Sequence, residues 1–291
     1  MELSPYRYEK DFKAEIDNEK TGCDVAFLEK QREKGIITDF DMHIISCIRD
    51  FGLISRKSAT DYINAKYPDK KPDYKRNFQK LCNNGILLRY RFVSENRKTP
   101  YVYKLSAGAK AYADRIFGRS FVKKYTAPDI DIADTGGCLR LVAFNQFYVR
   151  LVTAGYKIDG NPLYDYYLGK KGNKVLIDGI VKIEDKNKQK YDFVFICLRN
   201  TDNWQTLLKT IIDEVEKEKT KLNIVNPLYT ILVESHMMAA EVERFKRSIG
   251  YVMDTYYIPD IVAVTEQPLS VVYYVSPEDG FSNFREISLN L

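Results

Sequence analysis

Apolar residues recur at helical spacing between residues 38 and 85, and this spacing predicts three helices. Thr38 is suited to the N-cap of the first helix, and Gly52 ends that helix. Ser55 can cap a second helix over residues 56–66, and a third is expected over residues 73–84. The apolar stripe of the first helix consists of Phe40, Ile44, Ile45, Ile48 and Phe51.

Two β-rich runs follow the helices, at residues 86–93 and 101–105. The polar and basic segment 94–100 joins them, which predicts a β-hairpin with a charged tip. A further helix over residues 106–117 is expected to pack behind the hairpin. Three short helices followed by a hairpin is the element order of a winged helix-turn-helix.

The second half of the chain alternates between strand-like and helix-like segments. Residues 193–198 are apolar throughout, which predicts a central strand, and residues 228–233 are expected to be its neighbour. The predicted helices are 139–153, 203–219 and 237–249, and the predicted extended segments are 164–168, 175–183, 191–198, 228–234, 261–264 and 270–275. We therefore expect an α+β chain, with a winged helix-turn-helix followed by an α/β domain whose mixed sheet is covered on both faces.

A loss of periodicity before Gly136 and Gly137 suggests where one domain ends. The expected organisation is a winged-helix domain at residues 36–125, a linker at 126–137 and an α/β domain at 138–291. Residues 1–35 are charged and carry tyrosines, and the sequence assigns them no role. Residues 24–33 can form a helix, and we expect the segment as a whole to be a flexible arm.

Positive charge is concentrated in one part of the chain. Residues 53–124 hold 18 Lys and Arg against 5 Asp and Glu, a local excess of 13, whereas the whole chain is only +5, so the remainder carries −8. Such asymmetry is expected of a module that neutralises nucleic-acid phosphates. A merely solvated surface is the alternative interpretation.

Several classes of protein are disfavoured by composition. No apolar run approaches the roughly 20 residues of a membrane span, and the first residues do not resemble a signal peptide, so we expect a cytoplasmic protein without membrane contact. The five cysteines are scattered and favour reduced core thiols. With two histidines and no close Cys or His pairs, neither a zinc site nor another cofactor is expected.

The third predicted helix carries the densest candidate chemistry, because long cationic and amide side chains lie opposite Phe78 and Leu81. Arg76 or Lys75 can read guanine edges in a major groove, and Gln79 or Asn77 can read adenine. The helix residues expected to contact DNA bases or phosphates are Lys71, Tyr74, Lys75, Arg76, Gln79 and Lys80. An ordinary exposed, lysine-rich helix would have the same pattern.

The hairpin tip is a second candidate contact. Arg97 and Lys98 are expected to lie over the DNA backbone or the adjacent minor groove, as basic tips beside recognition helices do. Arg56 and Lys57, at the start of the second helix, are weaker candidates for phosphate contact. A solvated turn is the alternative for the tip.

A resemblance to a known family begins in residues 38–105, which contain the Gly85 break between helix and strand. Together with the transition from strand to helix at Tyr101 to Gly108, they resemble the replication-relaxation family of bacterial plasmids and mobile elements. The resemblance implies a second domain like the PD-(D/E)xK nucleases. Residues 139–151 look like the family's helix after the linker, and residues 177–179 are similar to its Pro-Asp strand motif. The resemblance covers about 230 residues, with loose motifs.

Nuclease chemistry of that type needs two or three carboxylates around Mg²⁺, with a lysine nearby. Asp178 is the candidate for the first carboxylate. The following strand departs from the pattern, because Cys197 and Arg199 stand where an acidic residue and a lysine are required. We therefore expect a degenerate nuclease scaffold without catalytic residues or a metal site.

The expected function is recognition of double-stranded DNA in plasmid or conjugative-element biology. The resemblance implies an accessory factor that marks an origin and recruits a relaxase or replication protein. The acidic second domain would bind that partner or form a homodimer. A winged-helix transcriptional regulator, a metal-dependent nuclease using Asp178 and a pure protein-interaction module remain alternatives.

Overall fold

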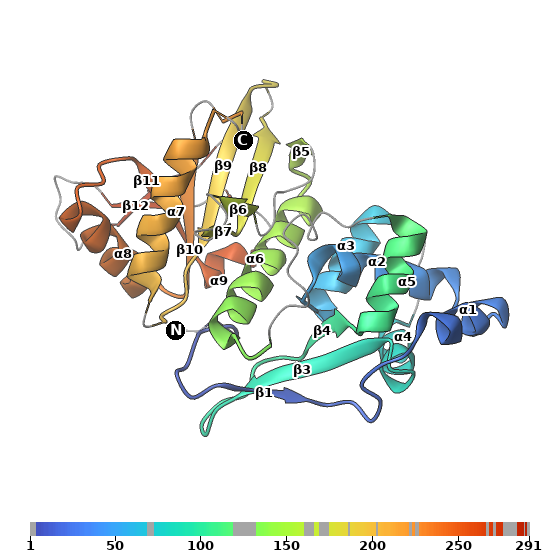
Figure 1. Ribbon diagram of the computed structural model, residues 1–291. Coiled ribbons are helices and arrows are strands. Elements are labelled where there is room, and N and C mark those ends of the chain that lie inside the picture. Colours follow the sequence, from blue (N-terminus) through green and yellow to red (C-terminus); the bar gives the residue numbers. More distant parts are fainter. Residues whose placement is uncertain are drawn as a thin grey trace. The chain divides into compact units, whose positions relative to one another are not determined.

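The computed structural model contains both helices and sheets (Figure 1). It divides into two compact units, Lys10–Val149 and a unit made of Met1–Glu9 with Arg150–Leu291. The residues that the structure describes are 4–68, 73–118, 132–159, 166–168, 175–185, 187–201, 203–220, 223–224, 227–265, 268–269, 272–275, 284–287 and 289.

The three helices expected near the start of the chain are confirmed. They are α2 (Asp39–Phe51), α3 (Arg56–Lys66) and α4 (Tyr74–Asn83). Thr38 forms a complete capping box with Asp41, and each of the other two helices starts with a side-chain cap. Gly85 has a φ of 68°, a left-handed conformation that glycine adopts without strain, and it turns the chain into the following strand.

The expected hairpin is also present, as β3 (Leu87–Val93) and β4 (Val102–Leu105). The two-residue strand β2 (Ile54–Ser55) pairs antiparallel with β4. Helix α5 (Ala107–Phe117) follows the hairpin. The resulting antiparallel sheet has the order β1-β3-β4-β2, so β1 and β2 are added to the hairpin expected from the sequence.

Strand β1 corrects the interpretation of the segment as a flexible arm for its described residues, 4–35, and the helix expected over residues 24–33 is confirmed. Strand β1 (Lys13–Ile16) pairs antiparallel with β3 (Figure 1). Helix α1 (Val25–Glu33) buries Leu28 completely. The side chain of Phe12 is also buried. The backbone of β1 finds its hydrogen-bond partners on β3, far along the chain, which a local pattern does not reveal.

Helix α6 (Thr135–Thr153) covers the predicted helix 139–153 and begins four residues earlier. The side chain of Asn145 is buried in it and donates hydrogen bonds to the carbonyl oxygens of Phe51 and Leu53, at 2.9 and 2.7 Å. Most of α6 accordingly groups with the Lys10–Val149 unit, whereas the sequence suggested a boundary at residues 126–137. Residues 126–131 of that predicted boundary region lie outside the described residues.

The other unit contains a mixed seven-stranded sheet of order β13-β12-β11-β10-β9-β8-β5. The predicted central strands are confirmed, since β9 (Lys190–Cys197) and β10 (Leu228–Val233) pair in parallel. The remaining strands of this unit are β5 (Lys157–Asp159), β6 (Tyr166–Leu168), β7 (Val175–Ile177), β8 (Gly179–Glu184), β11 (Thr255–Pro259), β12 (Val272–Val275) and β13 (Phe284–Ile287). Strands β6 and β7 pair with each other in a separate sheet.

Two long helices bury one face of this sheet. Helices α7 (Trp204–Glu218) and α8 (His236–Ser248) pack onto β9 and β10 in one hydrophobic cluster (Figure 1). In β9 the alternate side chains Phe193 and Phe195 are fully buried as well, so both faces of this strand are covered. This matches the pattern of a strand that is apolar throughout.

Two strand predictions in this unit were wrong. Residues 261–264 belong mainly to the short helix α9 (Asp260–Ala263), and the strand beside β10 is β11, which precedes them. Pro259 fixes the backbone at the end of β11, and Asp260 is favourable in a first helical turn. These two residues favour a helix more strongly than the β-branched residues at 261–264 favour a strand. The predicted strand 175–183 is interrupted at Asp178.

Among the residues that the structure describes, no helix is long and apolar enough to cross a membrane.

Candidate nucleic-acid interface

Helix α4 separates apolar from polar side chains as its sequence predicts. Asp73 caps the helix by accepting a hydrogen bond from the backbone of Arg76 at 3.1 Å. Phe78 is buried against the Tyr103 ring, with centroids 4.8 Å apart. On the opposite side, the exposed side chains are Lys75, Arg76, Gln79 and, at the end of the helix, Asn83. The helix therefore presents two cations and two amides outward, the groups that read base edges and neutralise phosphates.

Tyr74 is half-buried at the start of this helix rather than fully exposed. Its hydroxyl donates a hydrogen bond to Asn64 on α3, and its ring packs edge-on against Phe40 at 5.1 Å between centroids. Burial raises the pKa of Tyr74, so the hydroxyl keeps its proton near neutral pH. Tyr74 therefore joins α4 to α2 and α3.

Lys80 differs in orientation from the sequence prediction. Its ammonium forms an ion pair with the carboxylate of Asp41, whose side chain has no exposed surface, and donates to the carbonyl oxygen of Ile36 at 3.1 Å. The prediction that Lys80 shares the outward face with Arg76 was wrong, because a buried carboxylate on α2 attracts it. Lys80 holds α4 to α2.

The remaining candidates on the hairpin and α3 occupy two places in this unit. Lys98 is exposed at the hairpin tip, whereas the Arg97 guanidinium lies over the Phe12 ring, 5.8 Å from its centroid. Arg56 and Lys57 are exposed in the first turn of α3, beside the cap formed by Ser55. Lys71 lies outside the described residues.

Sequence reasoning missed a group of cations on β3. Arg89 and Arg91 alternate along the strand and therefore point to the same face of the sheet. The Tyr101 ring lies under both guanidinium groups, 4.8 Å from Arg89 and 5.5 Å from Arg91. Two cations spaced two residues apart in a predicted strand were the available signal.

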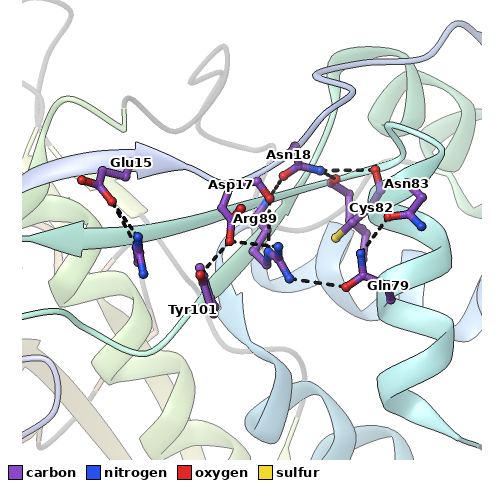
Figure 2. Close-up of polar contacts among 10 residues, drawn as sticks. Glu15, Asp17, Asn18, Gln79, Cys82, Asn83, Arg89 and Tyr101 are labelled. Carbon is purple, nitrogen blue, oxygen red and sulfur yellow. Dashed lines mark hydrogen bonds and ion pairs between the residues drawn. The ribbon is translucent and has the colours of Figure 1, made fainter.

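Strand β1 and the residue just after its end supply the acidic partners of these arginines (Figure 2). Glu15 forms an ion pair with Arg91 at 3.0 Å, and Asp17 forms one with Arg89 at 2.9 Å. The Tyr101 hydroxyl donates to the Asp17 carboxylate at 2.6 Å. This hydrogen bond, together with the two arginine charges, lowers the pKa of Asp17. The same hydrogen bond, burial and the Asp17 charge raise the pKa of Tyr101, although the two arginine charges oppose that shift. Asp17 is therefore ionised at neutral pH.

Arg89 also connects β3 to α4. Its guanidinium donates to the Gln79 side-chain oxygen at 3.5 Å, and the Gln79 amide nitrogen donates to Asn83 at 2.7 Å (Figure 2). The chain of contacts therefore runs from β1 through β3 to the exposed face of α4.

The second unit contains Asp178, the candidate carboxylate of a nuclease site. Asp178 is buried, and its carboxylate accepts a hydrogen bond from the backbone of Cys197 at 2.8 Å. Arg199 is fully buried and forms an ion pair with Asp260 at 3.1 Å. Although burial alone would lower the pKa of Arg199, Asp260 and the other acidic groups around it outweigh that effect and raise it. No group of three or more His, Cys, Asp or Glu side chains suited to a metal ion occurs in the described part of the chain.

Comparisons with protein-family models, with curated proteins and with solved structures found no match to this chain.

Proposed function

We propose that this chain binds double-stranded DNA through a winged helix-turn-helix made of α2, α3, α4 and the β3–β4 hairpin. The observation that carries the proposal is the outward face of α4, where Lys75, Arg76 and Gln79 are exposed while Phe78 is buried. The exposed Lys98 at the hairpin tip supports it. In this interpretation Lys75, Arg76 and Gln79 are nearest to the bases, and Lys98 contacts a phosphate.

The biological setting follows from the family resemblance alone. The chain would act as an accessory factor in the replication or conjugative transfer of a bacterial plasmid, marking an origin region. A relaxase or replication protein, or a second copy of the chain, would bind the second unit, which is proposed to be a nuclease-like scaffold without activity. Self-association is tested by measuring mass in solution over a range of protein concentrations.

Binding of the full chain to labelled duplexes at increasing salt tests the proposal. We expect affinity to fall steeply with salt, because binding releases counterions from the phosphates. Arg76→Glu should abolish binding, since it places a carboxylate on the outward face of α4. Lys209→Glu is the matched control, because Lys209 is exposed on α7 in the other unit and the change in charge is the same. Equal losses in both variants, or no binding at low salt, would contradict the proposal.

Selection of bound fragments from a host replicon distinguishes the two biological settings. Recovery of an origin of replication or transfer supports the accessory role. Recovery of promoter regions would instead support the transcriptional regulator.

A further inference from the structure

Gln79 is exposed, yet both ends of its side-chain amide are held. The amide nitrogen donates one hydrogen bond to Asn83, and the amide oxygen accepts one from Arg89. A glutamine amide carries two hydrogens and two acceptor lone pairs. With respect to the residues that the structure describes, one donor and one acceptor site therefore remain on Gln79, on the exposed face of α4.

Arg89 is itself fixed by several independent contacts. Its guanidinium pairs with the Asp17 carboxylate at 2.9 Å and donates from Nε to the Asp17 carbonyl oxygen at 3.2 Å. The Tyr101 ring lies 4.8 Å from the guanidinium. The Arg89 backbone nitrogen donates to the side chain of Asn18 at 2.6 Å. A planar guanidinium held by its fork and by an aromatic face has little freedom to turn.

We propose that Gln79 reads an adenine in the major groove and that Asp17 and Arg89 are positioning residues that fix its amide for this task. The inference rests on the proposed binding of duplex DNA. Adenine presents an acceptor at N7 beside a donor at N6, which matches the free donor and acceptor of Gln79. Guanine presents two acceptors at the same edge and leaves the Gln79 oxygen opposed to another acceptor.

The neighbouring pair of Glu15 and Arg91 provides an internal control. Glu15 lies in β1, two positions before Asp17, and makes the same kind of ion pair, at 3.0 Å. Figure 2 shows Glu15 on the far side of Arg89 from Gln79. Neutralising Glu15 therefore removes the same charge as neutralising Asp17 and leaves the contacts of Arg89 with Gln79 in place.

The experiment is selection of bound duplexes from a randomised pool, using the full chain and four variants. We expect the unaltered chain to prefer adenine over guanine at one position by roughly 5- to 100-fold. Gln79→Ala should abolish this preference, and Asp17→Asn and Arg89→Lys should each lower it by several-fold. The other positions of the selected site should stay as they are. Glu15→Gln should keep the adenine preference while strengthening binding to all duplexes slightly, because it removes a negative charge.

Each alternative result has a separate meaning. If the unaltered chain binds no duplex, the proposed function fails. If it binds without a preference for adenine, or if Gln79→Ala keeps the selected site unchanged, the present inference is overturned and DNA binding stands. An equal change at the adenine position in Asp17→Asn and Glu15→Gln would overturn the positioning role. A merely structural role of Asp17 would lower affinity for all sequences alike, and thermal unfolding of each variant measures that contribution directly.

Discussion

Asp41 is a carboxylate without exposed surface that joins the start of α2 to α4. It accepts hydrogen bonds from the Thr38 backbone and hydroxyl at 2.8 and 2.7 Å, from Asn77 at 2.7 Å and from Lys80. Asp41→Asn should lower the free energy of unfolding by about 2–3 kcal/mol, because these hydrogen bonds involve a charged acceptor and removing it leaves buried donors unpaired. Urea denaturation at pH 7 measures the change.

The effect of that substitution should depend on pH. Burial raises the pKa of Asp41, but the hydrogen bonds from Lys80, Asn77 and Thr38 outweigh burial, and the pKa lies below its ordinary value. A carboxyl whose folded pKa is lowered contributes its full stability above the unfolded pKa of about 3.9 and loses it as pH falls through the folded value. The deficit of Asp41→Asn should therefore shrink below about pH 4. A deficit of equal size at pH 7 and pH 3 would contradict this account. Asp39→Asn is the control, because Asp39 lies in the same helical turn and its side chain is 81 % exposed.

Arg76 and Lys98 should differ in what their removal does to binding. Arg76→Ala should weaken binding to the specific site by ~1–3 kcal/mol if Arg76 reads a base. Lys98→Ala should weaken binding to all sequences alike, because a phosphate contact carries no sequence information. This difference in role is tested by measuring the affinity of each variant for the selected site and for a random duplex. If both variants lose the same affinity for both duplexes, the two residues do not differ in role.

At the scale of elements, Lys80 and Lys98 should differ in role, because Lys80 forms an ion pair with Asp41 between α4 and α2. We expect Lys98 to contribute to DNA binding and Lys80 to the stability of the fold. Lys98→Ala should flatten the slope of log affinity against log salt by about one unit, since one phosphate contact is lost. Lys80→Ala should leave that slope unchanged and lower the stability of the fold, because its ammonium already pairs with a carboxylate. The measurements are salt titration of binding and urea denaturation. If Lys80→Ala flattens the salt slope as much as Lys98→Ala does, Lys80 contacts a phosphate after all.

The helices of the first unit could be predicted because their information is local. Thr38 and Ser55 cap α2 and α3, Gly85 follows α4, and the apolar stripes have helical spacing. The exposure of Lys75 and Arg76 follows from the same periodicity. Lys80 escaped prediction because its partner Asp41 lies 39 positions away, and a pattern within α4 contains no trace of it.

Strand β1 was missed for a similar reason. It has four residues, its side chains are mostly exposed, and its hydrogen-bond partners on β3 are about 80 positions further along the chain. The network from Asp17 through Arg89 to Gln79 depends on this pairing, so it could not be predicted either. The residues of the α4 face were predictable, whereas the groups that orient them were not.

At the scale of the whole molecule, residues from the start of the chain are bound at the ends of β10 and β11. Ser4 donates a hydrogen bond to Asp260, and the Tyr8 backbone donates to Glu234 at 2.6 Å. Burial raises the pKa of Glu234, and the nearby Arg199 charge opposes that shift. Asp260 thus accepts hydrogen bonds from Ser4 and from Arg199. Arg199, at the position where a nuclease site would need a lysine, therefore lies among these paired groups.

We predict that the full chain leaves supercoiled DNA intact when it is incubated with Mg²⁺ or Mn²⁺. The carboxylate of Asp178 accepts a hydrogen bond from the Cys197 backbone, and the position expected to supply the next carboxylate is Cys197 itself. The position expected to supply a lysine is Arg199, whose guanidinium is paired with Asp260. Gel electrophoresis over several hours measures any conversion to open-circular or linear DNA. Cleavage that persists through purification and disappears in Asp178→Ala would establish a metal-dependent nuclease, whereas cleavage that Asp178→Ala retains identifies a contaminating enzyme.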